Sequence, residues 1–108
     1  MQRVAQVIRL RRDKIEEYKR LHESVWPQVL DRIRKSNIRN YSIHLHDDLL
    51  FGYFEYHGAD FAADMAAMAA DGPTRQWWAL TEPCQQPLET AKTGEWWAST
   101  EQVFLMED

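Results

Sequence analysis

The stretch IRNYSIHLHDDLLFGYFEYHG (residues 38–58) predicts a β-hairpin at the centre of the chain. Apolar and polar side chains alternate in its first half, so Tyr41 and Leu45 are expected on one face. An aspartate pair at residues 47–48 suits a turn, and alternation resumes over residues 50–56. Two alternating runs joined by so short a turn are typical of paired antiparallel strands.

The segments before this hairpin predict a strand and then two helical pieces. Residues 4–10 (VAQVIRL) alternate roughly between apolar and polar side chains, as a strand does. Residues 15–33 repeat large side chains at helical spacing, and Asp13 is placed to cap that helix. Pro27 lacks a backbone N–H, so we expect two helices that meet at Trp26-Pro27, with Pro27 in the first turn of the second.

The segments after the hairpin predict two further helices and a closing strand. Residues 59–70 are alanine-rich, with larger apolar side chains at helical spacing, and DGP ends them. Residues 74–81 predict a short helix that Pro83 stops. A polar loop follows, and residues 100–106 (TEQVFLM) predict a last strand.

This order of elements predicts an α+β fold of the ferredoxin-like βαββαβ type. One antiparallel sheet would carry its helices on a single face. We expect the whole chain, residues 1–108, to form one domain. The other sheet face would be left bare, and a second copy of the chain would cover it in a homodimer.

The composition of the chain excludes several classes of partner. It is 44% hydrophobic and 28% charged with a net charge of −4, and its basic residues are dispersed, which argues against nucleic acid. Its apolar runs are far shorter than the ~20 residues of a membrane span. The single cysteine, Cys84, and the absence of a signal pattern at the N-terminus favour a cytoplasmic location.

Tyr18 and His22 stand four residues apart, which places both on one helix face. One interpretation is a pair packed at the edge of the core. The second is a general acid or base with a hydroxyl neighbour, for which histidine suits because its unperturbed pKa is about 6.5. Tyr41 likewise suits either the core or a pocket between sheet and helices.

Two tandem tryptophan pairs, Trp77-Trp78 and Trp96-Trp97, are unusual in so short a chain. Neighbours on a helix point about 100° apart, so one member of each pair is expected to face a partner subunit or a ligand. An indole face can stack on the C–H face of a pyranose ring, which makes carbohydrate a candidate ligand.

Motifs for cofactors are weak or missing in the sequence. His44 and His46 would share a strand face, but zinc needs three or four ligands, so two polar residues on the wetter sheet face is the simpler interpretation. Cys84 has no base at a useful spacing and is expected to be a passive thiol. Since no nucleotide or redox motif is found, any catalysis is expected to be proton transfer without cofactor or metal.

Five motifs in order resemble the L-rhamnose mutarotase family. They are EEYKRLHESVWPQVL (residues 16–30), NYSIHL (40–45), LLFGYFE (49–55), QWWAL (76–80) and EQVF (101–104). The similarity covers residues 4–104. It implies a dimeric α+β barrel of ferredoxin-like subunits that interconverts the α and β anomers of a 6-deoxy-hexose without metal or coenzyme.

The resemblance also implies roles for five residues. His22 would be the catalytic acid and base, which protonates the ring oxygen on opening and recovers the proton on closing. The substrate-binding residues would be Tyr18, Tyr41, Trp77 and Trp78. A tyrosine or a bound water would handle the anomeric hydroxyl, and a tryptophan would stack on the sugar.

Residues 80–97 (LTEPCQQPLETAKTGEWW) depart from the shorter loop of typical bacterial members. A mutarotase that prefers L-fucose is therefore also compatible with the sequence, and Trp96-Trp97 would either close the pocket or extend an interface. A cofactor-free monooxygenase and a non-catalytic dimeric binding module are compatible with the same fold. The binding module predicts that His22 is dispensable.

Overall fold

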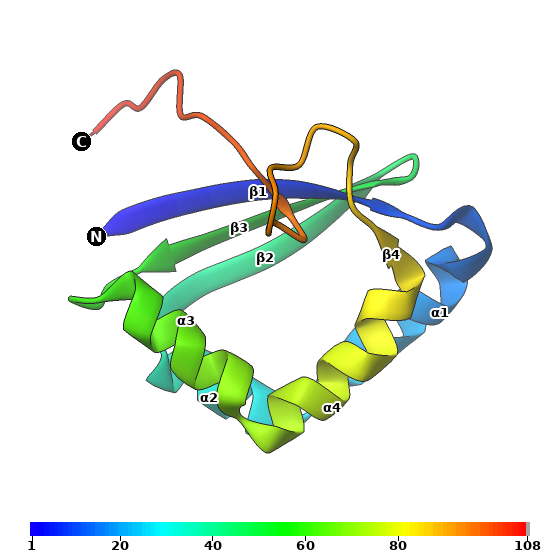
Figure 1. Cartoon of the computed structure of the whole chain (residues 1–108), viewed down its shortest axis with the longest axis horizontal. Helices are drawn as coiled ribbons and strands as arrows, with labels where there is room; N and C mark the ends of the chain where they lie inside the picture. The colour runs from blue at the N-terminus through cyan, green and yellow to red at the C-terminus, as the bar shows by residue number, and fades with distance from the viewer. Residues whose placement is uncertain (108) are drawn as a thin grey trace.

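The computed structural model describes residues 1–107 and has a curved antiparallel sheet with helices on one face (Figure 1). Its strands are β1 (Gln2–Leu10), β2 (Ile38–His46), β3 (Leu49–Tyr56), β4 (Gln85–Gln86) and β5 (Ala98–Ser99). The order across the sheet is β2-β3-β1-β4, and β5 also pairs with β1. This order confirms the ferredoxin-like α+β fold predicted from the sequence.

Four α-helices lie on the same side of the sheet (Figure 1). They are α1 (Ile15–Leu21), α2 (Pro27–Lys35), α3 (Phe61–Ala70) and α4 (Gly72–Thr81), joined in places by the 3₁₀ turns Arg12–Lys14, His22–Ser24 and Glu82–Cys84. Within residues 1–107, no helix combines the length and the apolar character that crossing a bilayer requires.

The predicted break at Trp26-Pro27 is confirmed. Pro27 is the first residue of α2, where its missing N–H removes no helical hydrogen bond. Val25 and Trp26 are extended, with ψ of 135° at each, so the chain changes direction between α1 and α2. Asp13 does not cap the first helix as predicted, because it lies inside the preceding 3₁₀ turn and makes no capping hydrogen bond.

The hairpin is confirmed, with Asp47 and Asp48 in the turn between β2 and β3. Asp47 has a φ of 55°, a left-handed conformation that aspartate tolerates better than most residues. The later helices are also confirmed, except that α4 starts at Gly72 rather than Thr74. Asp71 caps α4 by accepting hydrogen bonds from the backbone N and the hydroxyl of Thr74.

The predicted last strand over residues 100–106 is wrong. The final pairing with β1 involves Ala98 and Ser99, and the chain leaves the sheet at Thr100, whose hydroxyl donates to the carbonyl of Ala5. Beyond this point the chain runs past the side of the sheet opposite the helices (Figure 1). An alternating sequence forms a strand only where a paired edge is available, and these residues pair with no strand in the part of the chain that the structure describes.

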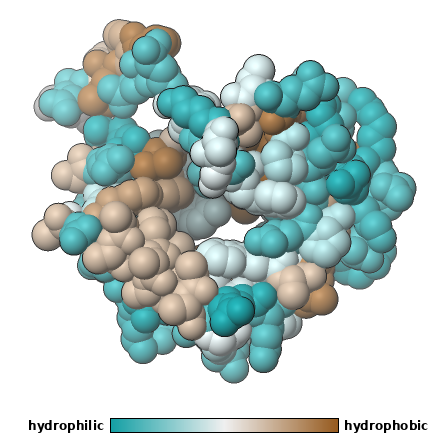
Figure 2. Space-filling model, in the orientation of Figure 1, coloured by the Kyte–Doolittle hydropathy of each residue, from teal (hydrophilic) through white to brown (hydrophobic). Residues whose placement is uncertain are grey.

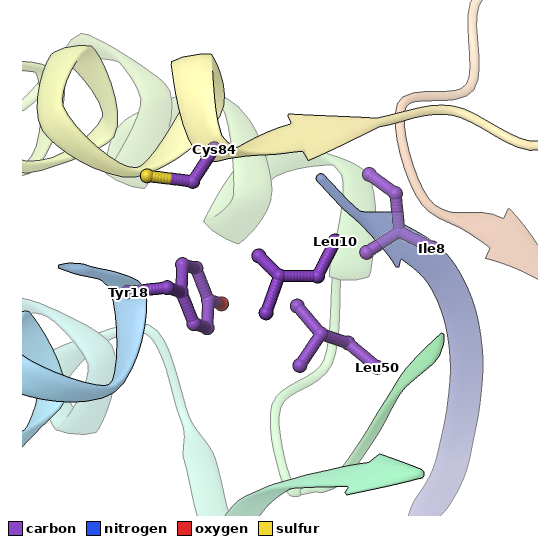
Figure 3. Close-up of a cluster of buried hydrophobic side chains, with 5 residues drawn as sticks. All are labelled: Ile8, Leu10, Tyr18, Leu50 and Cys84. Carbon is purple, nitrogen blue, oxygen red and sulfur yellow. The ribbon is translucent and has the colours of Figure 1, made fainter. Parts of the chain in front are cut away.

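The core is divided into two clusters between the sheet and the helices. One cluster contains Ile8, Leu10, Tyr18, Leu50 and Cys84, with Tyr18 and Cys84 brought to the strand residues from outside the sheet (Figure 3). The second contains Ile38, Phe54 and Tyr56, with partly buried side chains of α3 against it.

Candidate active site

A cavity with two adjoining lobes lies between the sheet and the helices. The first lobe has a volume of about 510 Å³ and the second about 600 Å³, within the range of about 300–1,000 Å³ usual for small-molecule sites. Figure 2 shows the molecule hollowed at the centre of this view. Residues that line both lobes include Tyr18, His22, Tyr41, Trp77 and Trp78. The structure thus brings together all five site residues predicted from the sequence.

His22 follows directly after α1 and is half-buried on the cavity wall. Its Nδ1 lies 2.8 Å from the backbone carbonyl oxygen of Tyr18. A carbonyl can only accept a hydrogen bond, so Nδ1 must carry the proton. In the neutral imidazole, Nε2 is then the nitrogen with a lone pair, and it has no hydrogen-bond partner in the described part of the chain.

Aromatic rings hold the His22 side chain from two sides. The Tyr18 ring centroid is 4.3 Å away, and the Trp77 centroid is 5.4 Å away in an edge-to-face arrangement. Trp77 is itself packed edge-to-face on Trp26, at 5.3 Å, and is only 6% exposed. Trp78 is half-buried and lines both lobes. The two tryptophans therefore differ in role, with Trp77 packed around His22 and Trp78 more open to a ligand.

A β-bulge directs Tyr41 into the cavity. Arg39 pairs with Glu55 and Ser42 with Tyr53, so two residues of β2 oppose the single Phe54 of β3. The extra residue is Asn40, which has a φ of 53°. Without it, strict alternation from the buried Ile38 would point Tyr41 to the outer face.

Both cavity tyrosines are kept in the neutral form at ordinary pH. Burial raises the pKa of Tyr18 strongly, and the hydrogen bond from Gln85 opposes this with a smaller effect. Burial of the phenol among surrounding atoms raises the pKa of Tyr41 to about 12. Tyr41 is 38% exposed as a whole, which agrees with a place on the wall of an open cavity. Neither phenol is therefore a ready base, and both are hydroxyl donors and acceptors.

The segment from residue 85 to residue 97 contributes Gln85, which the sequence interpretation missed, and the pair Trp96-Trp97, which it placed either at the pocket or at an interface. Gln85 is buried and donates from Nε2 to the Tyr18 hydroxyl at 3.2 Å. Trp96 donates from Nε1 to the side-chain amide oxygen, Oε1, of Gln85 at 2.8 Å. Trp97 lies over Gly52, where a Cβ would be 3.3 Å from the indole. The tandem tryptophans were the available signal, but nothing in the sequence links them to Gln85.

The remaining candidate groups lie apart from this cavity. His44 and His46 are exposed on β2, and residues 1–107 hold no cluster of three or more His, Cys, Asp or Glu side chains that could bind a metal ion. Cys84 is buried in the core and its thiol lies 3.3 Å from a carboxylate oxygen of Glu17. Burial and this carboxylate raise the pKa of the thiol to about 11, which keeps it protonated.

The chain is similar in sequence to known proteins. The family model described as L-rhamnose mutarotase matches residues 3–106. An L-rhamnose mutarotase of Burkholderia orbicola is 34% identical over 99 residues, which cover 84% of this chain and 92% of that protein.

Two solved structures share the fold of the chain. An L-rhamnose mutarotase from Formosa agariphila superposes with a TM-score of 0.76 at 20% identity, over 99% of this chain and 100% of that one. Tetracenomycin F2 cyclase from Streptomyces glaucescens superposes with a TM-score of 0.72 at 10% identity, over 100% of this chain and 99% of the cyclase chain.

Proposed function

The chain belongs to the L-rhamnose mutarotase family, and we propose that His22 moves the proton on which its reaction depends. The protein is a sugar mutarotase, an isomerase that interconverts the α and β anomers of L-rhamnose. The observation that carries the role of His22 is its place on the wall of a cavity, with one ring nitrogen fixed by a carbonyl and the second unpaired within residues 1–107.

The reaction needs one proton acceptor and one proton donor. A pyranose opens when the anomeric hydroxyl loses its proton, the bond from C1 to the ring oxygen breaks, and the ring oxygen gains a proton. The aldehyde then turns about the C1–C2 bond and the ring closes on the opposite face. No proton is consumed overall, so a site that holds the sugar between two suitable groups is sufficient.

We assign His22 as the acceptor in its neutral form, in which the proton on Nδ1 is donated to the Tyr18 carbonyl. Neutral His22 presents the Nε2 lone pair, which takes the proton of the anomeric hydroxyl and returns it when the ring closes. A tyrosine hydroxyl, from Tyr18 or Tyr41, transfers its proton to the ring oxygen as the bond to C1 breaks, and it recovers that proton when the ring closes. This proposed division reverses the expectation from the sequence, in which His22 protonates the ring oxygen.

Trp78 is the better placed of the two tandem tryptophans to stack on the sugar, because Trp77 is buried against His22. The first lobe offers an apolar wall for the methyl group of a 6-deoxy sugar. Its apolar residues include Val25, Val29, Ile33, Leu45 and Met68. A hexose with a hydroxyl at C6 would have to desolvate that hydroxyl against this wall, which is unfavourable.

The proposal includes a homodimer formed through the outer face of the sheet. Helices cover one face, and the outward side chains of the opposite face include Phe51, which is 44% exposed. The C-terminal segment, residues 100–107, runs past that side with Val103 87% and Phe104 78% exposed. A sheet face that no helix covers and an unpaired segment with exposed apolar side chains on the same side suit a second copy of the chain.

A cytoplasmic location is also part of the proposal, supported by the one cysteine being a buried thiol rather than half of a disulfide. Cell fractionation with a tagged chain tests it directly, and recovery with a secreted fraction would contradict it.

Anomer exchange measured by saturation-transfer NMR tests the function. Equilibrated L-rhamnose is expected to exchange between anomers at a rate that rises with protein concentration. Faster acceleration for L-fucose than for L-rhamnose would support a mutarotase that prefers L-fucose. Sugar binding without acceleration would support the binding module, and no acceleration for any sugar of the panel would refute the mutarotase.

A further inference from the structure

We propose that Gln85, held in place by Trp96, is a positioning residue that makes Tyr18 the hydrogen-bond donor of the site. The inference rests on the proposed function and deepens it, because it selects Tyr18 over Tyr41 as the hydroxyl that donates to the sugar ring oxygen. Gln85 and Trp96 both lie within residues 80–97, where the sequence departs from the pattern of typical family members.

Gln85 is a buried amide that connects a tyrosine to a tryptophan. It is the first residue of β4, where it pairs with Leu10 of β1, and it is 4% exposed. Its Nε2 lies 3.2 Å from the Tyr18 hydroxyl, and its Oε1 lies 2.8 Å from Nε1 of Trp96. The backbone pairing positions the main chain of Gln85, and the two hydrogen bonds position its side-chain amide.

The indole of Trp96 determines the orientation of the amide. An indole N–H can only donate a hydrogen bond, so the atom of Gln85 that faces it must be the carbonyl oxygen. The NH₂ group of Gln85 then necessarily faces Tyr18. The donor chemistry of the indole thus fixes which way the amide points.

The amide in turn determines what the Tyr18 hydroxyl can do. The phenol oxygen accepts the N–H of Gln85, so the single phenol proton must be donated elsewhere. No acceptor for that proton is present among residues 1–107, and Tyr18 lines both lobes of the cavity beside His22. The proton is therefore available to an acceptor oxygen of a bound sugar.

Tyr41 lacks an equivalent arrangement. No side chain in the described chain donates to its hydroxyl, so nothing fixes its proton as a donor toward the cavity. Burial keeps Tyr18 protonated by raising its pKa, which preserves it as a donor. Gln85 thus acts on the reaction through Tyr18 and need not touch the sugar.

Gln85→Glu provides the sharpest test, because it keeps the shape of the side chain and reverses one hydrogen bond. The introduced carboxylate still accepts from Trp96 but must also accept from Tyr18, which turns the phenol proton away from the cavity. We expect the anomer exchange rate to fall on the order of 10–100-fold at neutral pH. We expect its rate, taken relative to the wild type at the same pH, to recover as the pH is lowered and that carboxyl group becomes protonated.

Two matched variants separate this effect from a general disturbance. Gln86→Glu makes the same change at the next residue, which is exposed, and is expected to keep the wild-type rate. Gln85→Leu removes the donor without supplying an acceptor, so its loss should be smaller and should show no recovery at low pH. Circular dichroism and thermal unfolding establish that each variant is folded.

A readout without sugar makes the result independent of the enzyme activity. With ¹³Cζ-labelled tyrosine, assigned by Tyr18→Phe, the Tyr18 signal should move in Gln85→Glu at neutral pH and return on acidification. A wild-type shift and a wild-type rate in both Gln85 variants would overturn the inference while leaving the mutarotase function intact. If the wild-type chain accelerated no sugar, the function would fall, and the ¹³C signal would still decide the arrangement of Gln85 and Tyr18.

Discussion

The roles proposed for His22 and Tyr18 are complementary because a different neighbour fixes the proton of each. The carbonyl of Tyr18 places a proton on Nδ1 of His22 and leaves Nε2 as an acceptor. The amide of Gln85 occupies the acceptor side of the Tyr18 hydroxyl and leaves its proton for donation. In the proposed mechanism, ring opening requires one acceptor and one donor, and these two side chains are neighbours, with ring centroids 4.3 Å apart.

The raised pKa values of the cavity tyrosines predict how stability depends on pH. Tyr41 has a folded-state pKa of about 12 and that of Tyr18 is also raised, against an ordinary value of about 10 in the unfolded chain. The folded state therefore binds these protons more tightly. The stability they confer is complete below pH ~10 and is lost as the pH rises from there through the folded-state values.

Urea unfolding across this range measures the effect. The free energy of unfolding should fall with increasing pH above pH ~10, and Tyr18→Phe should make that decline shallower. An unchanged pH slope in Tyr18→Phe would mean that the decline has another source.

The bulge in β2 predicts a difference between two substitutions of Asn40. A left-handed φ costs most residues about 1–2 kcal/mol, which glycine avoids. Asn40→Ala should therefore lower the free energy of unfolding relative to Asn40→Gly. Both variants lose the hydrogen bond from Asn40 to Glu55, so the comparison isolates the backbone conformation.

Chemical denaturation of the two Asn40 variants checks this, and anomer exchange reports the position of Tyr41. Equal stability of Asn40→Ala and Asn40→Gly would contradict a requirement for the left-handed conformation. If Asn40→Ala is less stable but still exchanges the anomers at the wild-type rate, the left-handed residue affects stability and the placement of Tyr41 does not depend on it.

Several elements were predictable because their signals belong to single residues or to their spacing. The missing N–H of Pro27 predicts the break between α1 and α2, and the alternation on either side of residues 47–48 predicts the hairpin. The bulge was not predicted, because the alternation around Tyr41 looks regular in the sequence. The irregularity appears only when Ile38 and Tyr41, three residues apart, are both known to face the helices. A count along the sequence does not reveal an extra residue at Asn40.

The contacts of the site were less predictable than the elements that carry them. Tyr18 and His22 are neighbours on one helical segment, so their spacing predicted their proximity. Gln85 is 67 residues from Tyr18, and only the sheet brings them together. The strand predicted over residues 100–106 failed for a related reason, since pairing depends on an edge that the local sequence does not describe.

At the scale of the whole molecule, the fold alone leaves the chemistry open. The same arrangement of sheet and helices superposes on an L-rhamnose mutarotase and on a polyketide cyclase. What carries the function is the set of side chains that the fold directs into the space between its layers. The family relationship and the cavity residues together select a sugar as the ligand.

The sheet with one bare face predicts a dimer in solution. Light scattering after size exclusion should give a mass of about twice the 12.8 kDa chain. Phe51→Glu places a charge on the outer sheet face and should shift the protein toward the monomer. Leu80→Glu changes an exposed apolar residue on the helical side and serves as the matched control.

A dimer that resisted Phe51→Glu but dissociated in Leu80→Glu would place the interface on the helices instead. A monomeric wild-type protein at all concentrations would contradict the dimer altogether.

The most direct test of the central claim compares His22→Ala with His44→Ala in the anomer exchange experiment on L-rhamnose. His44 is exposed on β2 and bonds to Ser42, so its loss should leave the exchange rate unchanged. His22→Ala should reduce protein-dependent exchange by roughly 10²–10⁴-fold while the circular dichroism spectrum is preserved. A folded His22→Ala variant that exchanges the anomers at the wild-type rate would contradict the role given to this histidine.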